Sequence, residues 1–195
     1  MRKFKLLSLL GLLLCGGALW SQPEPERAHR IRKAQFPSAA YERLEPHLSG
    51  VKMLRYYREI DSGGIRFEAR FRKARLQYRV AFHPDGTIEQ TAFGIEPPDL
   101  PSDTWDAIRE GLKARVGAHR VRAMWQVYPG KSFGSEVQLF RNTYQNLMLP
   151  EIRYGLMVRT TATHSRKTLE AVFDSSGVLL SLRDALPPNY DHVLY

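Results

Sequence analysis

The chain has 195 residues, of which 43% are hydrophobic and 25% are charged, and its formal net charge is +9. This composition predicts a globular protein of one domain or two small ones and excludes a fully disordered chain. The one cysteine, Cys15, excludes a disulfide framework within the chain and a zinc-finger cluster. A basic balance of this size is compatible with nucleic acid as a partner, so the distribution of the charge decides what it means.

The first 21 residues have the pattern of a secretory signal peptide. Three basic residues precede an apolar run of ten residues, which is half of the roughly 20 that a helix needs to span a bilayer. Small residues follow, and we expect cleavage near Ser21–Gln22. Two alternatives are an uncleaved membrane anchor and a lipoprotein processed at Cys15, although Leu14 fits poorly before a lipidated cysteine. The basic residues are Arg2, Lys3 and Lys5, and the apolar run is Leu6 to Cys15.

Removal of this segment lowers the net charge and removes the cysteine. The remaining chain has 26 basic and 20 acidic residues, a net charge of +6, and no cysteine. A thiol nucleophile and a thiolate metal site are then excluded. We expect a periplasmic or extracellular protein with no integral membrane span after cleavage. Nucleic acid is scarce in those compartments, so we expect no nucleic-acid partner.

Two amphipathic helices are predicted after a polar linker at residues 22–35. Both begin at a Pro-Ser pair, where Ser38 and Ser102 are candidate N-caps, and both carry apolar residues at i, i+3 and i+7. Pro46 should shorten or kink the first helix. Gly50 and Gly117 are predicted to end the two helices. The apolar positions are Tyr41, Leu44 and Leu48 in the first helix and Trp105, Ile108 and Leu112 in the second.

Strand patterns follow each helix. Residues 51–60 and 119–128 are the first strand of each set, and 62–64 form a hairpin turn. The turn at 83–86 recurs at 174–177, with glycine closing both. The predicted fold is α+β, with two tandem repeats, each a helix on about four antiparallel strands. The predicted boundaries are repeat 1 at 36–99, repeat 2 at 100–186 with an insert near 130–153, and a tail at 187–195.

Alternation along the strands assigns their faces. Phe67, Ala69 and Phe71 should point toward the helix as core, and arginines alternate with them toward water. The insert is too apolar for an idle loop. We expect a long loop with room for a short helix, which covers the open sheet edge or packs on the core. The alternative is a partner-binding loop.

The doubled unit of helix, strands and aromatic–turn–glycine hairpin resembles the PepSY-like domain, and more narrowly the beta-lactamase-inhibitor-like PepSY-like proteins of Bacteroidetes. The resemblance covers nearly all of residues 36–186. It implies a small secreted binding module without catalytic residues, sometimes proposed to inhibit a hydrolase, and a concave sheet that grips a partner protein. The insert departs from the compact repeat and leaves open whether both repeats share one sheet. The residues that carry the resemblance are Phe36, Pro37, Tyr41, Leu44, Leu48 and the run Tyr78–Ile88, then Leu100, Pro101, Trp105, Ile108, Leu112 and the run Leu169–Leu179.

The patterns that carry common catalytic chemistry are missing from the sequence. No two of the six histidines have i, i+3 or i+4 spacing, and there is no HExxH, GxSxG or phosphate-binding loop. We therefore expect no metal, no cofactor and no enzymatic activity; a hydrolase with an unrecognised site is the alternative.

The arginines are the best candidate binding residues, because guanidinium groups bind carboxylates and phosphates through two hydrogen bonds. Gathered on one sheet face, they could bind an acidic protein partner, or, as an alternative function, anionic glycans or lipid head groups. In the other interpretation they are a solvated face paired across strands with Glu59, Glu68 and Glu89. The predicted binding residues are Arg55, Arg66, Arg70, Arg72, Arg75 and Arg79.

Overall fold

The computed structural model describes residues 26–161 and 166–186. This part of the chain forms one antiparallel sheet of nine strands, in which each strand pairs with the next along the chain. The predicted signal peptide, Cys15 and the predicted tail at 187–195 lie outside the described residues. The strands are β1 (Arg27–Ile31), β2 (Val51–Asp61), β3 (Gly64–Lys73), β4 (Leu76–Phe82), β5 (Ile88–Ile95), β6 (His119–Pro129), β7 (Arg153–Thr160), β8 (Thr168–Asp174) and β9 (Leu179–Asp184).

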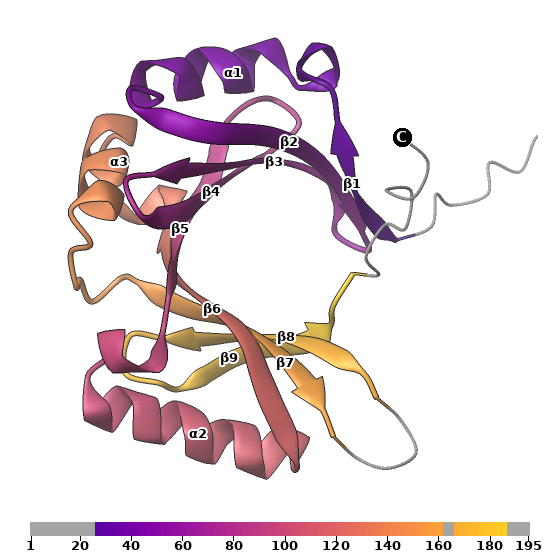
Figure 1. Ribbon diagram of the computed structural model, residues 1–195, viewed down its shortest axis with the longest axis vertical. Coiled ribbons are helices and arrows are strands. Elements are labelled where there is room, and N and C mark those ends of the chain that lie inside the picture. The colour runs from indigo at the N-terminus through magenta and orange to yellow at the C-terminus, as the bar shows by residue number, and fades with distance from the viewer. Residues whose placement is uncertain (1–25, 162–165, 187–195) are drawn as a thin grey trace, which may run out of the picture.

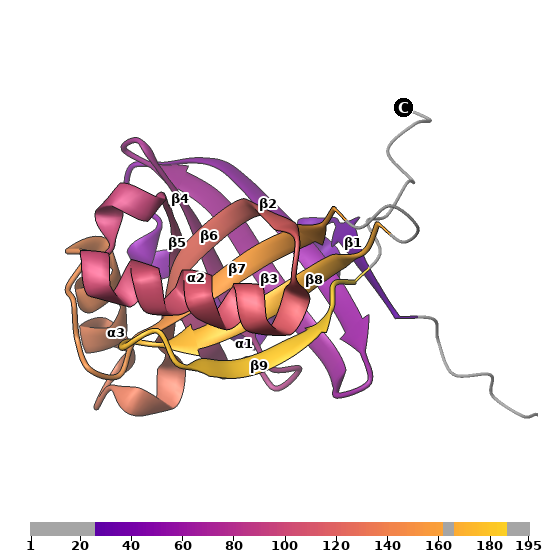
Figure 2. The ribbon, with the colours of Figure 1, turned by 90° about the horizontal axis from the view of Figure 1, so that it is seen from below.

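Within the described residues, helices cover one side of this sheet and not the other (Figures 1 and 2). The α-helices are α1 (Ser38–Leu44), α2 (Ser102–Val116) and α3 (Glu136–Tyr144), and short 3-10 helices are η1 (Lys33–Gln35), η2 (Glu45–His47), η3 (Pro97–Asp99) and η4 (Gly130–Ser132). The sheet curls strongly, and α1, α2 and α3 all lie on the outside of the curve (Figures 1 and 2). Among the described residues, no helix is both long and apolar enough to cross a membrane.

The α+β class is confirmed, and a single sheet runs from β1 to β9 without interruption. One helix precedes β2–β5 and another precedes β6–β9, which is the predicted element order. That these two parts are tandem repeats of one unit stays a prediction.

The predicted linker at 22–35 is partly wrong, because Arg27–Ile31 form β1 at the edge of the sheet. Only Ile31 of this strand is buried. The segment lacks the apolar alternation that marks a strand, so pairing with β2 stabilises an extended conformation that local preference does not indicate.

The helix boundaries correct the predicted caps. Pro37 and Pro101 occupy the N-cap positions, so Ser38 and Ser102 are the first helical residues and neither helix has a side-chain cap. The first helix is shorter, as predicted: α1 has 7 residues and α2 has 15. Pro46 lies in η2, directly after α1. Gly117 ends α2 at φ 72°, whereas Gly50, at φ 71°, follows η2 instead of ending α1.

Only α3 has a side-chain N-cap among the three α-helices, since Ser135 Oγ accepts a hydrogen bond from Gln138 N at 3.2 Å. Replacing Ser135 with alanine should lower the free energy of unfolding by about 1 kcal/mol. Ser38→Ala is the matched control, because Ser38 makes no capping bond, and its effect should stay within about 0.5 kcal/mol. Urea unfolding of both variants checks this; equal losses would contradict the assignment of the cap.

The main core fills the space between the helices and the outer face of the sheet. Ala69 and Phe71 are buried there and Phe67 packs against them, so the predicted faces of β3 are confirmed. The Phe36 ring, just before α1, lies 4.7 Å from that of Tyr56 and 5.6 Å from that of Phe82. Further along the sheet the same core contains Ile108, Leu112, Leu139, Phe140, Leu156, Val158, Ala171 and Phe173.

The two predicted glycine turns dock against helices. Gly86 has φ 86° and donates from its N–H to His83 O at 2.9 Å. A Cβ at this position would lie 2.7 Å from both Ala39 Cβ and Ala40 N in α1. Gly177 has φ 89°, and its Cβ would lie 2.8 Å from Thr104 O in α2. Both positions therefore require glycine for conformation and for space.

The insert contributes α3 to the core. Leu139 and Phe140 are buried, and the Phe140 ring stacks on His47 with centroids 3.7 Å apart. Tyr144 donates to the carbonyl of His47 at 2.9 Å. The expectation that the insert packs on the core, with a short helix, is confirmed.

Candidate binding face

The sheet face opposite the helices, here called the inner face, carries most of the ionisable side chains of the strands. The sheet curls so that this face is the concave side of the curve (Figure 1). The charged residues of the inner face used below are Arg55, Glu59, Asp61, Arg66, Glu68, Arg70, Arg72, Arg79, Glu89, Glu170 and Arg183.

Three of the predicted arginines form a row across neighbouring strands. Arg55 pairs in register with Arg70, and Arg70 pairs with Arg79, so β2, β3 and β4 each place one guanidinium in this row. Like charges directly opposite each other destabilise a sheet. The row therefore requires neighbouring counter-charges or contact with water.

Two arginines contact carboxyl groups of the same face. Arg66 lies 3.4 Å from Glu59, 3.2 Å from Asp61 and 3.3 Å from Glu89. Arg70 lies 3.2 Å from Glu59 and also contacts Glu68. The three glutamates are those that the sequence offered as ion-pair partners, so this interpretation describes Arg66 and Arg70.

Arg79 is held by an aromatic ring instead. Its guanidinium lies 3.9 Å from the ring centroid of Trp125 in β6, across β5. Gly94 pairs with Trp125 in register and leaves the space above β5 open for this contact. Burial is the main cause that lowers the pKa of Arg79, and the neighbouring charge of Arg70 lowers it further. A guanidinium desolvated over an indole ring gains about 2 kcal/mol from the contact.

Sequence reasoning missed Trp125. The residue alternates with buried Met124 and Gln126 in β6, which places its ring on the inner face. An aromatic residue on the polar side of a predicted strand was the available signal.

The other three predicted arginines are open to water. Arg55 and Arg72 are exposed on the inner face, and Arg75 is exposed in the turn between β3 and β4. Among the described residues, none of the three has an ion-pair partner. The structure thus divides the six predicted arginines into two halves. The internal half contacts other side chains and consists of Arg66, Arg70 and Arg79. The other half is available to a ligand and consists of Arg55, Arg72 and Arg75.

Glu59 lies at the centre of the internal half. Burial is the main cause that raises its pKa, to about 7, and the nearby Glu68 adds to the effect. Arg66 and Arg70 act in the opposite direction but do not restore an ordinary value. Glu59 therefore holds its proton up to near neutral pH.

A second ionic group joins distant strands. Arg183 of β9 lies 3.0 Å from Asp61, at the end of β2, and its other guanidinium nitrogen lies 2.6 Å from Glu170 of β8. Arg183 and Asp61 are 122 residues apart in the sequence, so local sequence patterns could not predict this contact.

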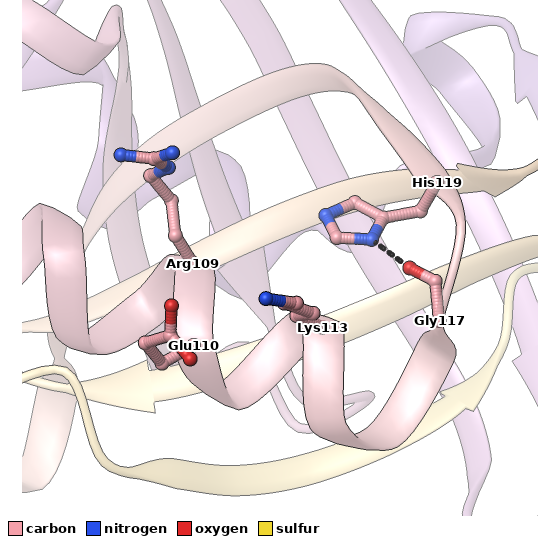
Figure 3. Close-up of a pocket in the computed structure, with 5 residues that line it drawn as sticks. All are labelled: Arg109, Glu110, Lys113, Gly117 and His119. Carbon is pink, nitrogen blue, oxygen red and sulfur yellow. Dashed lines mark hydrogen bonds between the residues drawn. The ribbon is translucent and has the colours of Figure 1, made fainter.

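A shallow depression of about 310 Å³ lies elsewhere, by the C-terminal half of α2 (Figure 3). It is lined by Arg109, Glu110, Lys113, Gly117 and His119, and His119 Nδ1 lies 2.6 Å from Gly117 O. None of the predicted binding residues lines it. Within the described residues, no cluster of three or more histidine, cysteine, aspartate or glutamate side chains could hold a metal ion.

Neither models of protein families nor the curated proteins provide a match to this chain. Solved structures do. A BLIP-like protein from Bacteroides fragilis NCTC 9343 has 13% sequence identity and a TM-score of 0.47, over 80% of this chain and 91% of that chain. A DUF2874 family protein from Bacteroides ovatus ATCC 8483 has 14% identity and a TM-score of 0.49, over 80% of this chain and 92% of that chain.

Proposed function

We propose that this chain is an exported, non-enzymatic binding module whose inner face contacts the acidic surface of a protein partner. The observation that carries the proposal is the exposure of Arg55 and Arg72 on the inner face and of Arg75 in the adjoining β3–β4 turn, without an ion-pair partner among the described residues. Exposed guanidinium groups offer paired N–H donors that match carboxylates.

The proposed chain organisation is the one derived from the sequence. It has a signal peptide at 1–21, a PepSY-like unit at 36–99, and a second unit at 100–186 that carries the insert. The partner is an envelope or secreted protein, such as a hydrolase whose activity the module modulates. Arg66, Arg70 and Arg79 are engaged within the protein, since Arg66 and Arg70 are paired with carboxyl groups and Arg79 lies over the ring of Trp125.

The double variant Arg72→Glu with Arg75→Glu tests the binding residues. The mature chain is used as bait for envelope and secreted extracts, and recovered proteins are identified by mass spectrometry. A genuine partner should be recovered with the unaltered chain and its affinity should fall at least about tenfold with the variant, because two attractive contacts become repulsive.

The matched control is Arg115→Glu with Arg141→Glu. These arginines are exposed on α2 and α3, so the control changes the net charge equally but leaves the inner face intact. Recovery of the partner should survive in the control. Equal recovery with both double variants would contradict the assignment of the face, and recovery of anionic glycan or lipid in place of a protein would favour the alternative class of ligand.

A further inference from the structure

Only side chains bridge the two ends of the curled sheet within the described residues. In the strand order β1 pairs only with β2 and β9 only with β8, so no backbone ladder closes the curve. One contact that crosses it is the Arg183 bridge, defined here as Arg183 with Asp61 and Glu170. Six strands separate β2 from β9 in the sheet.

Both partners of the crossing contact are held in their charged forms. Burial acts to raise the pKa of Asp61, but the hydrogen bond from Gly63 N–H and the charges of Arg66 and Arg183 outweigh it, and the pKa is lowered. Burial likewise acts to lower the pKa of Arg183, and Glu170 and Asp61 reverse its effect. The ion pair of Arg183 with Asp61 is therefore stabilised in its charged form.

Closure places opposite walls of the inner face within electrostatic range. Glu170 of β8 acts on Arg66 and on Arg79, which belong to β3 and β4. If loss of the bridge moves β8 and β9 away from the end of β2, this carboxylate also moves away from the arginines. The charge presented by the inner face thus depends on whether the curve is closed.

We propose that the Arg183 bridge regulates access to Trp125 and the internal half of the arginines on the inner face, which opens further when the ion pair of Arg183 with Asp61 is broken. Arg55 and Arg72 are already exposed while that ion pair is intact. This inference rests on the proposed function, since it takes the inner face as the binding site. The Arg183 side chain is 43% exposed, so an incoming carboxylate can reach it and replace Asp61. An acidic partner would then open the face that it binds.

Opening is measured first without any partner. Spin labels on Ser62→Cys and Leu180→Cys, both exposed positions, report the distance between the β2–β3 turn and β9. The only cysteine of the sequence is Cys15, so a chain that begins at residue 22 is labelled only at these positions. Arg183→Gln and Asp61→Asn should shift the distances to longer and broader values. Asparagine keeps the side-chain oxygen that accepts from Gly63 N.

Lys167→Gln is the control, because it removes an exposed ion pair with Asp184 at the same edge without touching β2. Its distances should equal those of the unaltered chain. Unchanged distances in Arg183→Gln would overturn the proposal.

Access is measured through Trp125. In a Trp105→Phe background the chain from residue 22 retains Trp125 alone, and acrylamide quenching of its fluorescence reports how open the inner face is. Quenching should rise in Arg183→Gln and stay constant in Lys167→Gln. Opening without a rise in quenching would overturn the control of access. Neither measurement uses a partner, so the failure of the bridge is distinguishable from the failure of Arg72 and Arg75 as binding residues.

Discussion

Replacing Gly86 with alanine should lower the free energy of unfolding by about 3 to 5 kcal/mol. Two costs combine at this position. The backbone has φ 86°, which disfavours any residue with a Cβ. The new Cβ would also lie 2.7 Å from Ala39 Cβ and Ala40 N, so the turn after β4 must separate from α1. Phe36 and Ala40, which pack in the same core, would lose contacts in consequence.

Gly50→Ala separates the two costs. Gly50 has φ 71° but has no atom within 4 Å of a Cβ position, so it carries the conformational cost without the clash. Its loss should be about 1 to 2 kcal/mol. Urea unfolding followed by circular dichroism gives both values. Similar losses for Gly86 and Gly50 would show that the turn does not pack against α1 as described.

Glu59→Gln should remove a pH dependence of stability worth roughly 3 kcal/mol. The folded-state pKa of Glu59 is about 7, against an ordinary value of 4.5. Between these values the folded chain holds a proton that the unfolded chain has released. Stability from Glu59 is therefore fully present below pH 4.5 and is lost as the pH rises through 7.

The measurement compares unfolding free energies at about pH 5 and about pH 8. The unaltered chain and Glu59→Gln should be similarly stable at the lower pH, where Glu59 is neutral, and Glu59→Gln should be the more stable at the higher pH. Glu42→Gln is the control, because Glu42 is exposed on α1 and its variant should follow the unaltered chain. Parallel pH profiles of the unfolding free energy for Glu59→Gln and the unaltered chain would show that the pKa of Glu59 is not raised in the folded protein.

Local sequence patterns predicted the features that local physics determines. Alternation alone assigned Ala69 and Phe71 to the core, and the glycine turns at 86 and 177 followed from the conformations that only glycine adopts at low cost. The same rules misplaced Ser38 and Ser102 by one position, since a proline before each serine already occupies the N-cap.

The candidate site could be predicted only in part, because its character depends on curvature. Alternation placed Arg66, Arg70 and Arg79 on one face, and their counter-ions could be proposed from neighbouring strands. The contact of Arg79 with Trp125 and the contact of Arg183 with Asp61 depend on how far the sheet bends. No periodicity in the sequence encodes that bend.

The strand order has a consequence for how the chain folds. Since every strand pairs with its sequence neighbours, the backbone ladders form from contacts that are close along the chain. β proteins built from local pairings avoid the entropic cost of closing long loops and fold faster than those with distant pairings. This sheet can grow strand by strand from β1, so a chain that emerges N-terminus first can fold progressively. The ion pair of Asp61 with Arg183 would form last.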